Sequence, residues 1–326
     1  MKGKLEFEKI VKRRAELDMK QSELAESASV SINIVRSVEI GRSESSVEAL
    51  SKICEVLGLK LDDIYNPDFK NTKIISFVNN KGGVGKTSLC AAIGCILAEQ
   101  DYNVLFIDFD MQMNLTRSLG MEKQDKHLGM AIDMEHDLEN YIYKTKYKNV
   151  DIIVSDPSMA IVDMQLFTKI NRESIVKYGL KNIIDKGIYD FIICDTNPVL
   201  GILNYNVLNV TNYVVIPIEL EIFSIYGLDT LINYIENVKK NNEKLKIAGI
   251  VVNKYDLREK TITETCEKVV TNLFGDKVFK TRIGVDTKLK QSQFDSEPVI
   301  YAQKSSRISR QYRELTRELI SVVNEK

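Results

Sequence analysis

A glycine-rich segment at residues 81–87 limits the possible fold of this chain more than any other feature. It follows an apolar, β-branched run at residues 74–78 that predicts a buried strand, and it precedes a predicted helix over residues 88–99. A glycine-rich turn between such a strand and helix can wrap its backbone N–H groups around phosphate, and the helix N-terminus adds positive potential. The sequence therefore predicts a phosphate-binding loop within an α/β domain.

Two lysines distinguish this loop from the common pattern GxxxxGK[ST]. That pattern has glycine at position 80, where this chain has Asn80 followed by Lys81. Lys86 can neutralise β- and γ-phosphate charge, and the Thr87 hydroxyl can ligate Mg²⁺. The alternative is a glycine turn without a ligand, but the strand, helix, lysine and threonine are all in register. We predict that nucleotide is bound by Gly82, Gly83, Val84, Gly85, Lys86, Thr87 and Ser88.

The loop resembles the deviant Walker A motif of the ParA/MinD family of ATPases. That resemblance implies ATP and ADP as ligands, Mg²⁺ as cofactor, and a homodimer that encloses two ATP molecules. In the family the first lysine reaches the partner's ATP, so Lys81 is expected to act in trans where the transferring phosphoryl group spreads negative charge. Lys86 is expected to act within its own subunit, and both lysines are catalytic candidates.

An aspartate pair follows the next apolar run. Residues 108–120 resemble the family pattern DxDPQGNAT..LG, with Met111 and Met113 in place of its proline and glycine. Carboxylates at the end of a parallel strand lie beside the phosphate loop, where they can hold Mg²⁺ or orient the attacking water. We assign Asp110 to positioning of the water and Asp108 to support of the Mg²⁺ shell. The alternative for each is a cap on the following helix.

Two later strand ends carry the remaining site candidates. Residues 189–195 resemble the family's Walker B pattern YDxIIID, which implies that Asp195 binds Mg²⁺ through water. Another apolar run ends at Asn253, whose amide could hydrogen-bond a base edge, so Asn253 is the adenine-contact candidate. An ordinary turn asparagine is the alternative. The resemblance continues in order over residues 72–322, through segments at 213–228, 281–286 and 297–299.

Composition limits the compartment and the partners. A length of 326 residues with 44% hydrophobic residues suits two globular domains. A net charge of −1 gives no overall basic field, so any DNA site must be a local patch. The five cysteines lack CxxC spacing, and neither a signal peptide nor a membrane-spanning run is evident. We expect a soluble, cytoplasmic protein, associated with nucleoid or plasmid DNA and without a membrane partner.

Residues 1–66 differ in character from the rest of the chain. They show helical periodicity and predict no strand, and they end at the breaker Asn66-Pro67-Asp68. We therefore expect a small all-α domain over residues 1–66 and a linker over 67–72. A doubly wound, mostly parallel α/β P-loop ATPase domain is expected over 73–326.

The helices predicted over residues 21–28 and 31–40 resemble a helix-turn-helix of the Cro/XRE type, QxxLAxxxGVSxxxIxxxExG. The pattern is matched by Gln21, Leu24, Ala25, Val30, Ser31, Val35, Glu39 and Gly41, with Ser29 at its usual glycine. The resemblance implies that Ser31, Asn33 and Arg36 read bases, and that Gln21 and Arg42 contact phosphates or base edges. Residues 1–70 hold 12 Lys and Arg against 13 Asp and Glu, so a protein–protein adaptor is the alternative.

A basic stripe near the C-terminus is a second DNA candidate. A helix predicted over residues 305–323 has Arg310, Arg313 and Arg317 outside its apolar face, and residues 280–326 hold ten basic residues against six acidic ones. A solvated outer face is the alternative.

These resemblances favour a ParA-type DNA partition ATPase, stimulated by a ParB-like centromere-binding partner and repressing its own operon through the helix-turn-helix. The alternative is a nucleotide-gated transcriptional repressor without cargo. A MinD-like membrane-positioning ATPase is less favoured, because Gln112 and Asn114 match the ParA pattern. Electron transfer, as by the nitrogenase iron protein, needs paired cluster cysteines that the sequence lacks.

Overall fold

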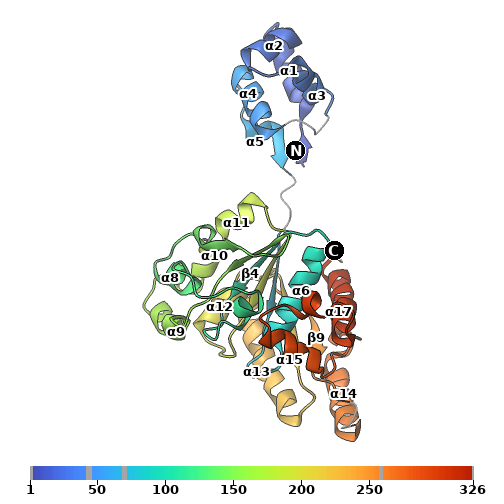
Figure 1. Cartoon of the computed structure of the whole chain (residues 1–326). Helices are drawn as coiled ribbons and strands as arrows, with labels where there is room; N and C mark the ends of the chain where they lie inside the picture. Colours follow the sequence, from blue (N-terminus) through green and yellow to red (C-terminus); the bar gives the residue numbers. More distant parts are fainter. Residues whose placement is uncertain (1–2, 42–45, 68–71, 257–259, 325–326) are drawn as a thin grey trace. The chain divides into compact units, whose positions relative to one another are not determined.

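The chain divides into two compact units, Met1–Lys70 and Asn71–Lys326, which are described separately (Figure 1). The structure is a computed structural model, and it describes residues 3–41, 46–67, 72–256 and 260–324. Arg42, predicted to contact DNA, lies outside these described residues.

Short helices form most of the first unit. They are α1 (Phe7–Glu16), α2 (Gln21–Ser27), α3 (Ile32–Glu39), α4 (Val47–Leu57) and α5 (Leu61–Ile64). The two predicted helices of the helix-turn-helix are confirmed as α2 and α3, and Ser29 between them has a left-handed φ of 54°. Buried residues from these helices, among them Leu24 and Val35, form one apolar core.

Two short strands close the first unit, where the sequence predicts none. Strands β1 (Gly3–Leu5) and β2 (Tyr65–Pro67) pair antiparallel. The predicted helical module is confirmed, but its ribbon was not predicted. Three-residue strands are too short to show an alternating pattern, and each of these pairs with a segment about sixty residues away. Pro67 is tolerated there because a two-stranded ribbon has a free edge for a residue without an N–H.

A seven-stranded sheet forms the centre of the second unit. Its spatial order is β5 (Ile142–Lys144), β6 (Val150–Ile153), β4 (Val104–Asp108), β7 (Phe191–Asp195), β3 (Lys73–Phe77), β8 (Tyr213–Ile218) and β9 (Lys246–Val252). Only the edge strand β5 is antiparallel to its neighbour. The predicted doubly wound, mostly parallel sheet is therefore confirmed, and the carboxyl ends of β3, β4 and β7 meet at one edge.

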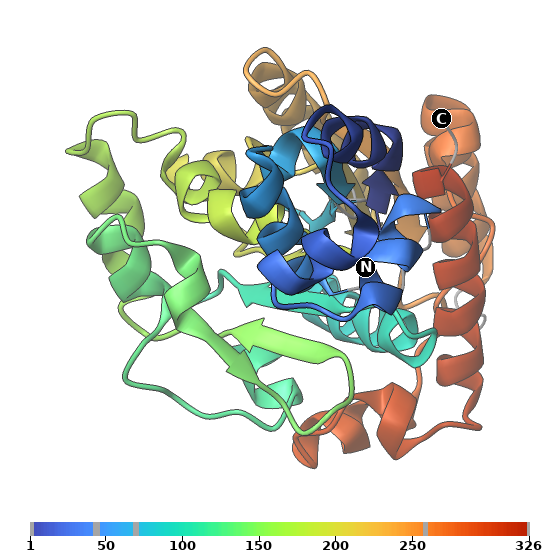
Figure 2. The ribbon, with the colours of Figure 1, turned by 90° about the horizontal axis from the view of Figure 1, so that it is seen from above.

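Helices cover both faces of this sheet because its strands are apolar on both sides. On one face the core includes α6 (Lys86–Glu99), α16 (Val299–Ala302) and α17 (Arg307–Asn324), and Figures 1 and 2 show α17, in red, running beside α6, in teal. The other face is covered by α8 (Leu128–Asp133), α9 (Met159–Phe167), α10 (Ile175–Gly179), α11 (Lys181–Lys186), α12 (Ile202–Leu208) and α13 (Ile222–Lys239).

The remaining helices are α7 (Asn114–Ser118), α14 (Lys260–Phe274) and α15 (Thr287–Phe294). Within the described ranges, every helix is too short or too polar to cross a bilayer.

Candidate nucleotide-binding site

The phosphate loop joins β3 to α6 at the carboxyl edge of the sheet. Gly83 and Gly85 have left-handed φ values of 78° and 92°, which glycine adopts at little cost. A cavity of about 720 Å³ lies beside the loop, with further walls from the segment after β4 and from α15 and α16. The structure brings to this cavity Gly82, Gly83, Gly85, Lys86, Thr87, Ser88 and Asp110, whereas Val84 is buried.

Lys86 lies against the backbone of its own loop and is almost fully buried. Its Nζ donates hydrogen bonds to the carbonyl oxygens of Asn79 and Lys81, both at 3.1 Å. Burial lowers the pKa of this ammonium, and the charges of Asp195 and Asp110 act in the opposite direction. Because both direct acceptors are neutral carbonyl groups, a bound phosphate would add the counter-charge.

Asp195, at the end of β7, is a buried carboxyl group whose oxygens lack hydrogen-bond partners among the described residues. Burial raises its pKa well above the ordinary range and the charge of Asp108 adds to the rise, whereas the nearby Thr87 hydroxyl and Lys86 lower it. Such a group is costly unless a ligand satisfies it. Mg²⁺ is commonly held by one or two carboxylates together with phosphate oxygens, so Asp195 and Thr87 fit a magnesium site completed by nucleotide.

Asp108, at the end of β4, is as buried as Asp195, but both of its carboxylate oxygens accept hydrogen bonds from the protein. Its Oδ2 accepts from the backbone N and the hydroxyl of Thr116 at 2.9 and 2.7 Å, and its Oδ1 accepts from the backbone N of Asp110 at 3.1 Å. Burial raises its pKa to about 6. The carboxylate thus orders the segment that carries Asp110 and serves the first turn of α7, as the capping alternative proposes. Its contact with Mg²⁺ stays a prediction.

The segment between β4 and α7 places Asp110 on the cavity wall. Asp110 Oδ1 accepts from the backbone N of Gln112 at 3.0 Å, and its carbonyl oxygen accepts from the Ser155 hydroxyl at 2.7 Å. Met113, at the glycine position of the family pattern, has a left-handed φ of 56° and a buried side chain. Burial of the methionine offsets the cost of that backbone conformation, so the turn keeps its shape without glycine.

Asn253, which follows the last residue of β9, is hydrogen-bonded to the backbone of the phosphate loop. Its Nδ2 donates to the carbonyl oxygen of Val84 at 2.7 Å, and the side chain is buried. A Cβ at Gly85 would lie only 2.0 Å from that nitrogen, so glycine is required there by contact as well as by conformation. The adenine contact of Asn253 stays a prediction.

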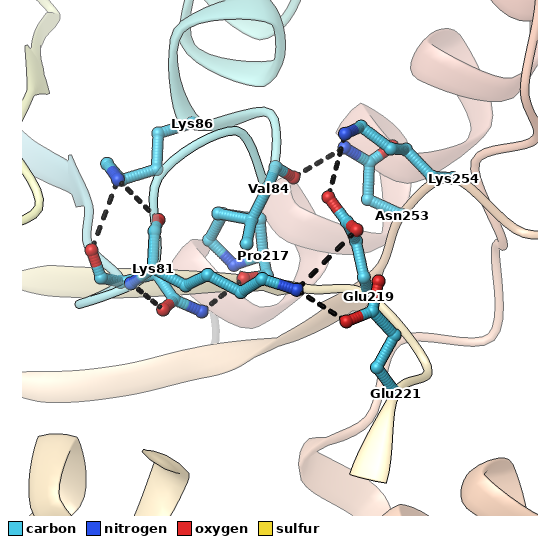
Figure 3. A network of polar contacts seen from close by, with 9 residues as sticks. Lys81, Val84, Lys86, Pro217, Glu219, Glu221, Asn253 and Lys254 are labelled. Atoms are coloured by element: carbon cyan, nitrogen blue, oxygen red, sulfur yellow. Dashed lines mark hydrogen bonds and ion pairs between the residues drawn. The ribbon is translucent and has the colours of Figure 1, made fainter. Parts of the chain in front are cut away.

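Lys81 forms a network that the sequence did not predict (Figure 3). Its Nζ lies 2.8 Å from Glu221 Oε2 and 3.8 Å from Glu219 Oε2, and Lys254 Nζ lies 2.8 Å from Glu219 Oε1. The hydrogen bond that Lys81 donates to Glu221 raises the pKa of Lys81, and partial burial acts in the opposite direction. The sequence holds one sign of this network. Glu219 stands where the family pattern VLIPVQ.E has glutamine, and it therefore adds a carboxylate beside the phosphate loop.

Asn79 is a second residue that sequence reasoning missed. Its side chain is buried, with Oδ1 accepting from the backbone N of Lys81 at 2.8 Å and Nδ2 donating to the carbonyl oxygen of Pro217 at 2.7 Å. Asn79 therefore links the start of the phosphate loop to β8.

In the first unit, a buried ion pair holds the helix-turn-helix together. Glu39 on α3 accepts from Arg14 Nε at 2.5 Å and from Gln21 Nε2 at 2.7 Å, which ties α1 and α2 to α3. Burial alone would raise the pKa of Glu39, but the hydrogen bonds and charge of Arg14 and the hydrogen bond from Gln21 together lower it. Gln21 thus has a structural partner, and its predicted DNA contact stays a prediction.

One face of α3 presents the predicted base-reading residues. Ser31, Asn33 and Arg36 are exposed. Ser31 is also the N-cap of the helix, since its hydroxyl accepts from the backbone N of Ile34 at 3.3 Å.

One arginine of the C-terminal basic stripe forms an ion pair within the protein. The apolar face expected on the helix of this stripe is formed by Ile308, Tyr312, Leu315, Leu319 and Val322; on α17 the first four are buried and Val322 is half-buried. Arg313 pairs with Glu99 of α6, whereas Arg310 and Arg317 are exposed. DNA binding by this stripe stays a prediction.

Family models match both units of the chain, and curated relatives match about three quarters of it. A model described as "AAA domain" matches residues 72–247, and one described as "Helix-turn-helix" matches residues 10–64. The sporulation initiation inhibitor protein Soj of Bacillus subtilis is 34% identical over 251 residues, which cover 76% of this chain and 98% of Soj. The chromosome partitioning protein ParA of Caulobacter vibrioides is 29% identical over 252 residues, which cover 76% and 94%.

Solved structures share the fold of the second unit. Cobyrinic acid a,c-diamide synthase from Mycobacterium smegmatis, with bound ATP analogue and magnesium, has a TM-score of 0.69 at 25% identity over 78% of this chain and 96% of its own. A putative plasmid partition protein from Borrelia burgdorferi, bound to AMPPNP, has a TM-score of 0.65 at 23% identity over 77% and 99%. With a two-lysine phosphate loop and relatives matched over nearly their whole length, this chain belongs to the ParA/MinD family of P-loop ATPases and carries an N-terminal helix-turn-helix.

Proposed function

We propose that this chain is a ParA-type DNA partition ATPase. Residues 73–326 would form an ATP-dependent sandwich dimer that binds DNA non-specifically and hydrolyses ATP slowly, and residues 1–66 would bind an operator and repress it. ATP or ADP with Mg²⁺ would occupy the cavity, and a ParB-like centromere-binding protein would stimulate hydrolysis. The partition functions named for Caulobacter ParA and for the Treponema pallidum chromosome-partitioning ATPase Soj support this assignment.

The direction of the two loop lysines carries the proposal. Figure 3 shows the ammonium groups of Lys81 and Lys86 pointing to opposite sides of the loop. Lys86 lines the nucleotide cavity, whereas the Lys81 ammonium lies among carboxylates outside it. This direction supports a role for Lys81 at a nucleotide bound by a second subunit, and each cavity would then be complete only in the dimer.

The residues divide the chemistry among them. Lys86 and the loop N–H groups would bind the β- and γ-phosphates, and Asp195 with Thr87 would hold Mg²⁺, which when bound neutralises phosphate charge. Asp110 would accept a hydrogen bond from the attacking water and orient it towards the γ-phosphate. Lys81 of the other subunit would stabilise the negative charge that develops during transfer.

The decisive measurement is ATP hydrolysis by the full chain, alone and with DNA and the protein encoded by the neighbouring reading frame. Partition predicts slow turnover that rises when both are added. A nucleotide-gated repressor, favoured by the exposed face of α3, predicts instead an operator affinity that changes with nucleotide while turnover does not respond.

Lys81→Ala is expected to keep ATP binding and lose dimer formation, because Lys81 lies outside its own cavity. Equilibrium dialysis would report binding, and sedimentation velocity at saturating ATP would report dimerisation. Lys148→Ala is a matched control, since Lys148 is also an exposed lysine paired with a carboxylate, Asp101, but at the opposite edge of the sheet. A wild-type protein that stays monomeric at saturating ATP would contradict the sandwich dimer.

Arg36→Ala is expected to weaken operator binding by roughly 1–3 kcal/mol at one base pair, because a bidentate arginine–guanine contact is lost. Binding to random DNA should change little. Lys52→Ala is the control, since it removes one exposed positive charge from α4 of the same unit. Fluorescence anisotropy on both DNAs at fixed salt would test this. Equal losses on operator and random DNA would argue against base reading by Arg36.

A further inference from the structure

A carboxylate pair, Glu219 and Glu221, holds Lys81 on its own subunit. We propose that Glu221, assisted by Glu219 and balanced by Lys254, forms a cis latch that must release Lys81 before the dimer closes. These are positioning residues, and they set the ATP concentration at which two subunits associate. The inference rests on the proposed trans role of Lys81.

Three loops at the carboxyl edge of the sheet build the latch (Figure 3). Lys81 comes from the phosphate loop, Glu219 and Glu221 lie between β8 and α13, and Lys254 follows β9. Lys81 is the shared element, with Glu221 Oε2 at 2.8 Å and Glu219 Oε2 at 3.8 Å. Neither carboxylate lines the nucleotide cavity, so the latch acts on the lysine and not on the subunit's own ATP.

Because its residues are partly exposed, this latch is weak enough for Lys81 to exchange the carboxylates for a phosphate. The Lys81 and Glu221 side chains are 38% and 56% exposed, and ion pairs at that exposure contribute little to stability. A triphosphate presented by a second subunit carries more negative charge than either carboxylate. Lys81 would therefore leave the carboxylates for the nucleotide. The free energy needed to break its ion pairs would weaken the association of the two subunits.

Lys254 acts against the latch. Its ammonium lies 2.8 Å from Glu219 Oε1 and neutralises the carboxylate that Lys81 otherwise approaches. Its backbone has a left-handed φ of 52°, which is unusual for lysine. Removal of Lys254 should leave Glu219 free to pair more fully with Lys81, and the latch should tighten.

The test is dimerisation measured by sedimentation velocity while a non-hydrolysable ATP analogue is titrated with Mg²⁺. Glu221→Gln keeps the side-chain shape and removes the charge, so the half-maximal analogue concentration should fall roughly two- to fivefold, the equilibrium effect of one partly exposed ion pair. Lys254→Ala should raise it. Glu236→Gln, which removes a carboxylate paired with Lys239 on α13, should leave it unchanged.

Two further readouts separate a latch from a structural effect. ADP affinity of the monomer, measured by equilibrium dialysis, should match the wild type in Glu221→Gln, because Glu221 does not line the cavity. Higher salt should shrink the difference between Glu221→Gln and the wild type, since screening weakens the exposed pair.

The outcomes distinguish the two proposals. If the wild-type protein fails to dimerise with the analogue, both the trans role of Lys81 and the latch are overturned. If it dimerises but Glu221→Gln needs the same or a higher analogue concentration, only the latch is overturned. A higher requirement would mean that Glu221 contributes to the closed dimer instead of opposing it.

Discussion

Lys86→Ala is expected to abolish measurable nucleotide binding, the largest change that any single substitution should cause. Among the described residues, the buried Lys86 ammonium donates hydrogen bonds to two neutral carbonyl groups, so a bound phosphate would be a charged group in direct contact with it. Hydrogen bonds to charged groups contribute about 1.5–3 kcal/mol each, and loss of about 3 kcal/mol lowers affinity roughly 150-fold. Isothermal titration with ATP and with ADP would measure this loss.

Thermal unfolding separates lost binding from misfolding in this variant. Without nucleotide, the unfolding midpoint reports only the loss of the hydrogen bonds to Asn79 and Lys81. With nucleotide at about 100 times the wild-type dissociation constant, the wild-type protein should gain about 2.7 kcal/mol of stability, and Lys86→Ala should gain at most about 0.3 kcal/mol. A rise of the midpoint as large as that of the wild type would exclude Lys86 from phosphate binding.

Local sequence patterns predicted the elements around the site because each depends on neighbouring residues. The apolar run at 74–78 is β3 with a shift of one residue, and the helix expected over 88–99 is most of α6. The turn at Ser29 also follows from local pattern, as does the helix expected from Ser31, which the structure shows as α3. The short pair β1 and β2 has no local signal, and it was not predicted.

Contacts between distant loops account for the rest of the site. Asn253 reaches Val84 across 169 positions, and Lys81 reaches Glu221 across 140. Both contacts depend on β8 and β9 lying in order beside β3, which no single motif specifies. The sequence could thus predict that Lys81 carries a special function, but only the folded sheet shows which groups hold its ammonium.

Asp110→Ala is expected to leave nucleotide bound and to slow hydrolysis by about 100-fold, the lower range for loss of a group that orients or activates a nucleophile. ATP should then hold the two subunits together, so the variant should accumulate as a dimer. Phosphate release, and sedimentation velocity with ATP and Mg²⁺, would measure the two effects. Lys81→Ala should give the opposite pattern, with ATP bound and no dimer.

Asp110→Asn is the matched variant that identifies the carboxylate as the cause. An asparagine oxygen can still accept from the backbone N of Gln112, and the carbonyl oxygen at position 110 can still accept from Ser155, so the turn should be retained. If negative charge orients the water, Asn and Ala should slow hydrolysis alike. If Asn retains wild-type turnover while Ala does not, Asp110 acts by shaping the turn. Unchanged turnover in both would move the water-positioning role to another group on the cavity wall.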